Sequence, residues 1–264
     1  MTLHNDILLL DVGGTFIKCS DGREIPVNSA GSREEIAASL REAVGDAGKV
    51  GVAIPGPFDF SNGIFLMKHK FAAVYGESFA DLCFSGQSEE TPSFRFMHDV
   101  NAALLGENPV GNTALVTIGT GLGFAYTRDG IVQKSAMGSP ARLVYNLPYC
   151  DGILEDFISK RGIIRTYNEL AGPSDVTVKE ISERARAGEK AAVLAFSRTG
   201  TILAMALQPV LTELNINRVI MGGQISRSFD LMEEELRNGF GPGISVTPSN
   251  DIGGAVFRGL ANLF

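Results

Sequence analysis

The sequence predicts an α/β protein built from two related halves, and three observations lead to that fold class. Short apolar stretches typical of buried strands alternate with segments of helical periodicity. An apolar strand, a glycine-rich turn and a second strand occur near residue 13 and again near residue 119. The chain has 264 residues, 44% of them hydrophobic and 20% charged, which is enough to bury a sizeable core. We therefore expect two α/β halves that face a cleft.

The first half reads as strands interleaved with helices. Strands are expected at residues 7–12, 15–19, 50–54, 64–66 and 94–97. Asp21 and Gly22 favour a hairpin turn, and Ser32 with Glu35 favours a capping box at the start of a helix that Gly45 or Gly48 ends. Further helices are expected at residues 78–84 and 101–107.

The second half begins with a strand pair and continues mostly as helices. Strands are expected at residues 114–118, 124–127 and 218–221, and helices at residues 152–161, 178–187, 190–214 and 254–264. We place the domains at residues 1–104 and 105–264, with room for the C-terminal helix to pack back at the hinge. No linker rich in Pro or Ser marks the boundary.

Charge and composition exclude several classes of protein. The balance of 23 Lys+Arg and 30 Asp+Glu gives a net charge of −7, which disfavours nucleic-acid and membrane partners. No apolar stretch approaches the roughly 18 to 20 residues of a membrane span. The three cysteines are widely separated and never form a C-x-x-C pair. A disulfide framework is therefore not expected, and the cytoplasm is the expected location.

The first candidate for chemistry is the turn Asp11-Val12-Gly13-Gly14-Thr15 after a buried strand. Adjacent glycines let the backbone approach a phosphate, and Asp11 could hold Mg²⁺ through water. The spacing is neither G-x-G-x-x-G nor a Walker motif, because no Gly-Lys-Ser/Thr follows. A plain glycine-rich hairpin with a solvated Asp is the alternative.

Two later glycine turns carry a similar signal. Gly119-Thr120-Gly121-Leu122-Gly123 follows a strand and offers a hydroxyl for a phosphoryl oxygen, although glycine in strands also marks bulges. Gly222 and Gly223 also follow a strand, where missing side chains leave room for adenine or simply form a turn.

The segment His98-Asp99-Val100-Asn101 lies where a strand gives way to a helix. Such a position can project the Asp99 carboxylate into a cleft, where it accepts a proton from an attacking hydroxyl. The alternative is simple helix N-capping, and the two roles are compatible.

Taken in order, these segments resemble the ROK family of sugar kinases and related repressors, within the actin-like ATPase (hexokinase-type) superfamily. The matching residues are Asp11–Thr15 with Lys18, then Val52–Pro57, Asp99–Glu107, Gly119–Gly123 and Val219–Gly223. The resemblance covers essentially the whole chain. It implies a two-domain actin-like ATPase (ribonuclease H-like) fold with a central cleft.

The resemblance also implies ATP-dependent transfer of the γ-phosphoryl group to a hydroxyl of a sugar or amino sugar. In that scheme Asp99 is the general base and Asp11 holds Mg²⁺ through water. ATP and its phosphates are assigned to Gly13, Gly14, Thr15, Lys18, Gly119, Thr120, Gly121, Gly222 and Gly223. Substrate binding is assigned to Gly56, Pro57, His98, Asn101 and Glu155. A homodimer is plausible by the same analogy.

The chain departs from the family pattern on the sugar side. Many members carry a Glu-x-x-His element and then a zinc motif rich in His and Cys, but residues 137–155 contain no histidine and only Cys150. We therefore expect no structural zinc and a substrate other than glucose, since polar contacts supply most sugar discrimination. Arg142 could accept an anionic group of the substrate or remain a solvated surface residue. His69-Lys70-Phe71 could border the sugar cleft or only line the small domain.

Two further classes of function compete with a kinase. A sugar-sensing regulator is disfavoured, because a first core strand near residue 7 leaves no room for a preceding helix-turn-helix and the net charge is −7. A catalytically silent nucleotide- or sugar-binding sensor of the same fold fits the altered sugar site. The presence of both Asp11 and Asp99 speaks against such a loss of turnover.

Overall fold

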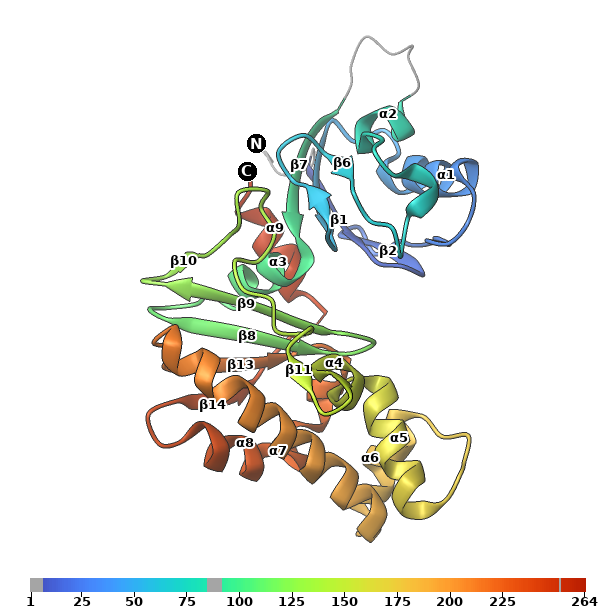
Figure 1. Cartoon of the computed structure of the whole chain (residues 1–264). Coiled ribbons are helices and arrows are strands. Elements are labelled where there is room, and N and C mark those ends of the chain that lie inside the picture. The colour runs from blue at the N-terminus through green and yellow to red at the C-terminus, as the bar shows by residue number, and fades with distance from the viewer. Residues whose placement is uncertain (1–6, 85–91, 252) are drawn as a thin grey trace. The chain divides into compact units, whose positions relative to one another are not determined.

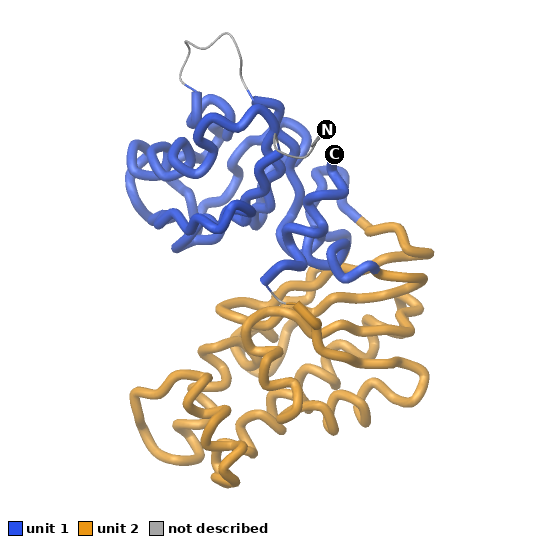
Figure 2. The backbone as a smooth tube through the Cα atoms, turned by 180° about the vertical axis from the view of Figure 1, so that it is seen from behind, with its two compact units in different colours: residues 1–108, 134–141, 253–264 blue, residues 109–133, 142–252 orange. Residues whose placement is uncertain are grey.

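The computed structural model describes residues 7–84, 92–251 and 253–264, and these form two compact units. Unit 1 comprises residues 1–108, 134–141 and 253–264, and unit 2 comprises residues 109–133 and 142–252 (Figure 2). The first observed boundary falls after Asn108, where the sequence places it after residue 104. Unit 1 also takes in an excursion from the second half and the C-terminal helix.

Unit 1 is built on a five-stranded sheet in the order β3-β2-β1-β4-β7 (Figure 1). An antiparallel meander comes first, and two strands parallel to β1 follow it. The strands are β1 (Ile7–Val12), β2 (Phe16–Cys19), β3 (Glu24–Pro26), β4 (Lys49–Ile54) and β7 (Ser93–His98). A small hairpin of β5 (Phe58–Asp59) and β6 (Ile64–Phe65) joins β4 to the helical segments that precede β7.

The helices of unit 1 follow local sequence signals closely. The capping box of Ser32 and Glu35 begins α1 (Arg33–Val44), and Gly45 ends it. Ser78 caps the short α2 (Phe79–Cys83), which follows the 3-10 helix η1 (Ala72–Val74). The remaining helices are α3 (Asp99–Gly106) and α9 (Ala255–Ala261).

The helices α3 and α9 cross closely at two glycines. A Cβ atom on Gly106 would lie 1.7 Å from the carbonyl oxygen of Ala255, and one on Gly259 would lie 1.8 Å from that of Ala102. Only glycine allows this approach, so the C-terminal helix is anchored to the helix that begins at Asp99.

Unit 2 repeats the plan of unit 1, with the sheet order β10-β9-β8-β13-β14. An antiparallel meander again comes first, and two parallel strands follow. The strands are β8 (Thr113–Ile118), β9 (Leu122–Arg128), β10 (Ile131–Val132), β13 (Arg218–Gly222) and β14 (Ser245–Pro248). The predicted repetition between the two halves is thus confirmed at the level of sheet topology.

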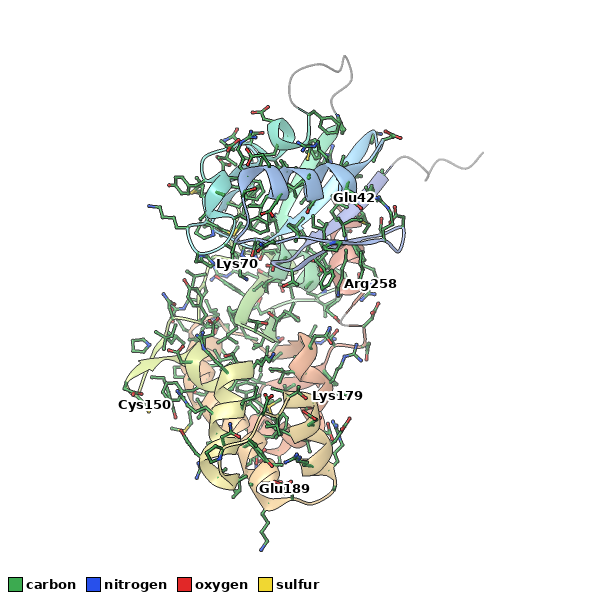
Figure 3. All side chains as sticks on the ribbon, turned by 90° about the vertical axis from the view of Figure 1, so that its right-hand side faces the viewer. Glu42, Lys70, Cys150, Lys179, Glu189 and Arg258 are labelled. Carbon is green, nitrogen blue, oxygen red and sulfur yellow. The ribbon has the colours of Figure 1, made fainter. Side chains whose placement is uncertain are left out.

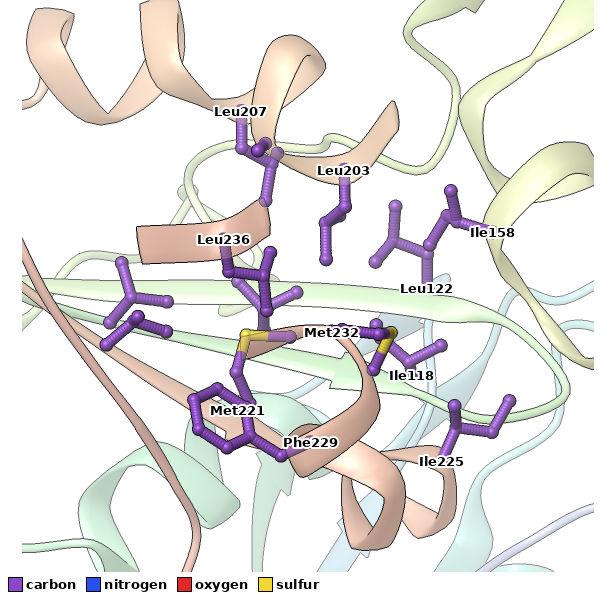
Figure 4. Packing of buried hydrophobic residues seen from close by; sticks show 14 of the residues in the cluster. Ile118, Leu122, Ile158, Leu203, Leu207, Met221, Ile225, Phe229, Met232 and Leu236 are labelled. Atoms are coloured by element: carbon purple, nitrogen blue, oxygen red, sulfur yellow. The ribbon is translucent and has the colours of Figure 1, made fainter. Parts of the chain in front are cut away.

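The helical part of unit 2 contains α4 (Leu154–Ile158), α5 (Lys160–Ala171), α6 (Val178–Arg186), α7 (Lys190–Glu213), the 3-10 helix η2 (Gln224–Leu231) and α8 (Glu233–Phe240). The interior is formed by aliphatic, methionine and phenylalanine side chains, which Figure 4 shows between the helices and the β8–β9 hairpin. The sequence predicts none of η2, α8 and β14.

The helix predicted at residues 152–161 is confirmed over Leu154–Ile158 and wrong at its start and at Ser159. Gly152–Ile153 forms strand β12 and pairs with β11 (Pro148–Tyr149). Ser159 then breaks the helix with an extended backbone, and the Lys160 N–H donates to the carbonyl of Gly119 at 2.9 Å. A contact with a distant loop therefore overrides the local helical preference.

Within the described residues, α7 is the one helix long and apolar enough to cross a membrane. It packs against the other helices of unit 2, with Phe196, Leu203 and Leu207 fully buried. These contacts fit a core helix of a folded unit.

Candidate active site

The carboxyl ends of three parallel strands in unit 1 bring predicted site residues together. β1, β4 and β7 are neighbours in the sheet. Asp11 is the residue before the last of β1, Gly56 follows β4, and Asp99 follows β7. This edge is where open α/β sheets bind ligands.

The turn after β1 is held closed by its own backbone. The Gly13 N–H donates to the Phe16 carbonyl at 2.9 Å, and a Cβ atom on Gly13 would lie 2.9 Å from that oxygen. The Gly13 N–H is therefore used within the turn, contrary to the expectation that it faces a phosphate. For the Gly14 N–H the expectation stays a prediction. Thr15 is exposed at the tip of the turn.

Asp99 occupies the first position of α3 and is held by its neighbours. Its Oδ1 lies 2.7 Å from His98 Nδ1 and accepts the Val100 N–H at 2.7 Å. Burial alone would raise the pKa of this carboxyl, but His98, the Val100 N–H and the charge of Lys70 outweigh it and hold the pKa below its ordinary value. About a third of the side chain is exposed. Asp99 is thus ionised at neutral pH and accessible.

Asp11 has the opposite electrostatic character. Burial and, second to it, the negative charge of Asp99 raise the pKa of its carboxyl to about 6, against the opposing positive charge of Lys18. Lys18 lies directly across the β1–β2 pair from Asp11. The pKa values of the two carboxyls at this sheet edge are therefore shifted in opposite directions.

Residues 134–141 belong to unit 1 and pack beside the loop after β4 and the start of α3. A Cβ atom on Gly56 would lie 3.4 Å from the His98 ring and 3.4 Å from Ser139 Oγ. Asn101 is fully buried and its side-chain amide donates to the Gly138 carbonyl at 3.1 Å. Asn101 therefore holds this segment in place, and in this structure its side chain reaches no solvent. Pro57, next to Gly56, is exposed.

In unit 2, the turn after β8 contacts Glu155. The Leu122 N–H donates to Glu155 Oε2 at 2.9 Å, and a Cβ atom on Gly121 would lie 2.8 Å from the same oxygen. Glu155 Oε1 lies 3.2 Å from an Arg161 nitrogen. The turn itself is closed by the Gly119 N–H, which donates to the Gly121 carbonyl at 3.0 Å. Thr120 is exposed at its tip.

The second glycine turn of unit 2 lies against the first. Gly223 has a φ of +79°, and a Cβ atom there would lie 2.4 Å from the Ile118 carbonyl oxygen. A Cβ atom on Gly222 would lie 3.1 Å from Leu115 Cδ1. Close packing of β13 against β8 therefore requires Gly223 even without a ligand, and it brings both turns to one sheet edge.

The region that departs from the family pattern is filled by charged and aromatic contacts. Arg161 pairs with both Glu155 and Asp156, whose Oδ2 also accepts the Ile153 N–H at 3.1 Å. A cavity of about 400 Å³ lies beside this network, and its lining residues are Asp151, Gly152, Asp156, Phe157, Arg161 and Arg165. Arg142, at the expected sugar position, pairs with Glu213 at 3.2 Å.

Among the described residues, no group of three or more His, Cys, Asp or Glu side chains is placed to hold a metal ion. Asp11 remains a single carboxylate that could bind Mg²⁺ through water. Sequence reasoning assigned no role to Arg161 or Ser139 and did not place Lys70 beside Asp99. Ser139 and Lys70 meet residues that are far apart from them in sequence, so no local signal could have found these contacts. Arg161 lies five and six residues after its partners, but the break at Ser159 lies between them.

Comparisons with known proteins place the chain among proteins of related sequence and fold. The model of the ROK family matches residues 33–245. A glucokinase of Thermotoga maritima is 28% identical over 255 residues, covering 86% of this chain and 72% of the relative.

Two solved structures show the same fold. A ROK family glucokinase of Streptomyces griseus, in complex with glucose and AMPPNP, superimposes with a TM-score of 0.78 at 21% identity, covering 97% of this chain and 98% of that one. A ROK family transcriptional regulator, a homologue of the E. coli MLC protein, has a TM-score of 0.78 at 16% identity, covering 100% of this chain and 82% of that one. The predicted actin-like ATPase fold is confirmed.

Proposed function

The chain belongs to the ROK family, and we propose that it is a kinase that uses ATP to phosphorylate a hydroxyl of a sugar or amino sugar. The observation that carries this proposal is the pair Asp11 and Asp99 at one sheet edge, with the pKa of the first raised and that of the second lowered. Two carboxylates whose environments separate their pKa values are suited to two different roles. AMPPNP bound by a structural relative supports ATP as the donor.

Asp99 is the general base of the proposed reaction. Its low pKa keeps it ionised at neutral pH, so it can accept the proton of the attacking sugar hydroxyl. His98 and the Val100 N–H both hold Oδ1, and this leaves Oδ2 for the hydroxyl. Phosphoryl transfer asks little more of the protein than positioning and charge stabilisation.

Asp11 fits the role of a magnesium-binding carboxylate. Its pKa of about 6 shows that burial and Asp99 destabilise its charge, and a divalent cation would compensate that charge. When bound, Mg²⁺ would neutralise charge on the phosphates of ATP. Lys18, across the strand pair, adds positive charge to the same edge.

Unit 2 supplies the remaining contacts of the proposal. The Gly119–Gly121 turn binds phosphate, with Thr120 as its exposed hydroxyl, and Gly222 and Gly223 lie beside adenosine. Glu155 accepts a sugar hydroxyl, because each carboxylate oxygen can accept a second hydrogen bond besides those from Leu122 and Arg161.

We further propose a substrate other than glucose, and an enzyme without structural zinc. In unit 2, Arg142 occupies the neighbourhood of the family's sugar-binding Glu and is already paired with Glu213. Arg161 holds Glu155 and Asp156 where many family members carry a zinc motif. A cytoplasmic location and a homodimer complete the proposal.

The direct test is a coupled assay of ADP release across hexoses, N-acetylhexosamines and sugar acids, with glucose included. We expect one non-glucose sugar to give a kcat/KM at least about tenfold above that of glucose. A preference for glucose would refute the substrate assignment while leaving the kinase intact. Stoichiometric zinc in the purified protein, measured by elemental analysis, would refute the second claim.

A catalytically silent sensor is the second candidate. Its support is the altered sugar side together with the fold shared with a transcriptional regulator. Silence in the ADP-release assay, combined with saturable binding of a sugar or nucleotide by calorimetry, would favour this function over the kinase.

A further inference from the structure

Lys70 lies against the glycine turn of unit 1. It belongs to the loop between β6 and η1 and is labelled in Figure 3. A Cβ atom placed on Gly14 would lie 3.7 Å from both Cδ and Cε of Lys70. The aliphatic stem therefore lies against Gly14, beside Ser29 Oγ, which would lie 3.1 Å from the same Cβ atom.

The backbone fixes this position through two hydrogen bonds. The Ser29 N–H donates to the Gly14 carbonyl at 3.2 Å, and the Phe71 N–H donates to the Ser29 carbonyl at 2.6 Å. Phe71 is fully buried, and its ring centroid lies 5.5 Å from that of Phe65. Lys70 is thus tied to the turn by the chain on its C-terminal side, and the half-buried stem has little freedom.

The charge of Lys70 is left without a partner. Among the described residues its ammonium group makes neither a hydrogen bond nor an ion pair within 4.0 Å, although its charge acts on Asp99. Lys68, two residues earlier, is exposed and lies over the Tyr75 ring at 5.3 Å. Such a half-buried cation, beside a glycine whose missing side chain leaves room for a ligand, is a good site for a phosphate-like anion.

We propose that the Lys70 ammonium group binds the γ-phosphoryl group of ATP beside Gly14 and remains in contact with it during transfer. The inference rests on the proposed kinase function and adds a residue that touches the reacting group. In the step, a bond forms between the sugar oxygen and phosphorus while the bond from phosphorus to the ADP oxygen breaks. The hydroxyl proton goes to Asp99, and Lys70 stays protonated throughout. Its positive charge stabilises the charge that spreads over the phosphoryl oxygens.

The test compares Lys70→Met, Lys70→Arg and the control Lys68→Met. Calorimetry with Mg²⁺ measures the affinity for AMPPNP and for ADP separately. We expect Lys70→Met to weaken AMPPNP binding about 10- to 100-fold with ADP changed less than about threefold, since a single charge-assisted contact to the γ-phosphoryl is lost. Lys70→Arg keeps the charge and should retain most of the affinity for AMPPNP. Lys68→Met should bind both nucleotides as the unaltered protein does. Thermal melting of each variant checks its fold.

Turnover adds a second readout that separates the two proposals. If Lys70→Met lowers kcat about 100-fold or more with the KM for sugar unchanged, the inference is supported. An equal loss of AMPPNP and ADP affinity, or no loss of either, overturns it. An effect confined to the KM of acidic sugars also overturns it and assigns the lysine to an anionic substrate group. If no sugar is phosphorylated but AMPPNP binding depends on Lys70, the γ-phosphoryl contact is supported, whereas its role in transfer is overturned together with the kinase proposal.

Discussion

Units 1 and 2 share the same sheet topology but differ in how far their charged side chains are compensated by partners. In unit 1 the burial of Asp11 disfavours its charge, and among the described residues Lys70 has no ion-pair partner. In unit 2 the comparable groups are satisfied: Glu155 is bound by the Leu122 N–H and Arg161, and Arg142 pairs with Glu213.

The difference indicates that unit 1 carries the groups suited to bind ligand charges and to catalyse the proposed reaction. Uncompensated charges raise the free energy of the protein without ligand and become favourable only when a cation or phosphate arrives. Satisfied charges hold loops in shape but gain less from a ligand. We therefore expect substitutions in unit 1 to act mainly on turnover, and those in unit 2 to act mainly on stability and on sugar binding.

The largest effect is expected from Asp99→Asn in unit 1. The amide cannot accept the proton of the attacking hydroxyl, so kcat should fall about 1,000-fold while the affinity for ATP changes little. Turnover is measured by ADP release and affinity by calorimetry. The exposed Asp46, changed to Asn in the same unit, is the matched control. Full activity of Asp99→Asn with an accepted sugar would remove the general-base assignment.

Gly223→Ala should give the largest loss of stability among the glycine turns. The new Cβ atom would lie 2.4 Å from the Ile118 carbonyl oxygen, and the φ of +79° disfavours any L side chain. We expect a loss of about 2 to 4 kcal/mol in the free energy of unfolding, measured by urea denaturation. Gly222→Ala, whose Cβ atom would meet only the ends of the Leu115 and Thr117 side chains, should cost less. Equal costs would show that packing does not distinguish the two glycines.

The features that the sequence predicts well are those written in a few adjacent residues. The capping box of Ser32 and Glu35 and the hairpin at Asp21-Gly22 form as expected, because each depends on neighbours within four positions. The repeated strand–turn–strand pattern also predicts the two matching sheets. Because these local signals agree with the tertiary fold, they predict the local structure correctly even when the fold is not known.

The features that the sequence does not predict depend on contacts between distant segments. The break at Ser159 arises where Lys160 meets Gly119, about forty positions earlier. The placement of Lys70 depends on hydrogen bonds that link Gly14, Ser29 and Phe71. Asn101 fits the family motif, but only the fold shows that its amide binds the Gly138 carbonyl. Residue roles at a site therefore need the packing as well as the motif.

Asp11→Asn tests whether the buried charge of Asp11 lowers the free energy of unfolding of the protein without ligand. The pKa of Asp11 is raised from 3.8 to about 6 in the folded state, so between these two pH values this carboxyl is more often protonated in the folded than in the unfolded chain. Its contribution to stability therefore falls as pH rises from about 4 to 6 and stays low above that. The variant should be more stable by about 1 to 3 kcal/mol at pH 7 and equal near pH 4, measured by denaturation in EDTA. Mg²⁺ should stabilise only the unaltered protein. A destabilised variant at pH 7 would contradict the difference drawn between the units.

The smallest effect is expected from Arg161→Met in unit 2. More than half of the Arg161 side chain is exposed, so its ion pairs with Glu155 and Asp156 contribute little to the free energy of unfolding. The Leu122 N–H still binds Glu155 Oε2 in the variant, but Oε1 loses its partner and the carboxylate gains freedom. The KM for sugar should rise about three- to tenfold with kcat nearly unchanged, because a ground-state contact is loosened.

Arg165→Met is the control: Arg165 lies over the Phe157 ring at 4.5 Å and lines the same cavity, but its ion pair is with Glu169. If both variants raise KM equally, the cavity as a whole and not the Arg161–Glu155 pair sets the affinity for sugar. If kcat falls and KM does not, Glu155 acts in the transition state, and unit 2 shares in the chemistry assigned here to unit 1.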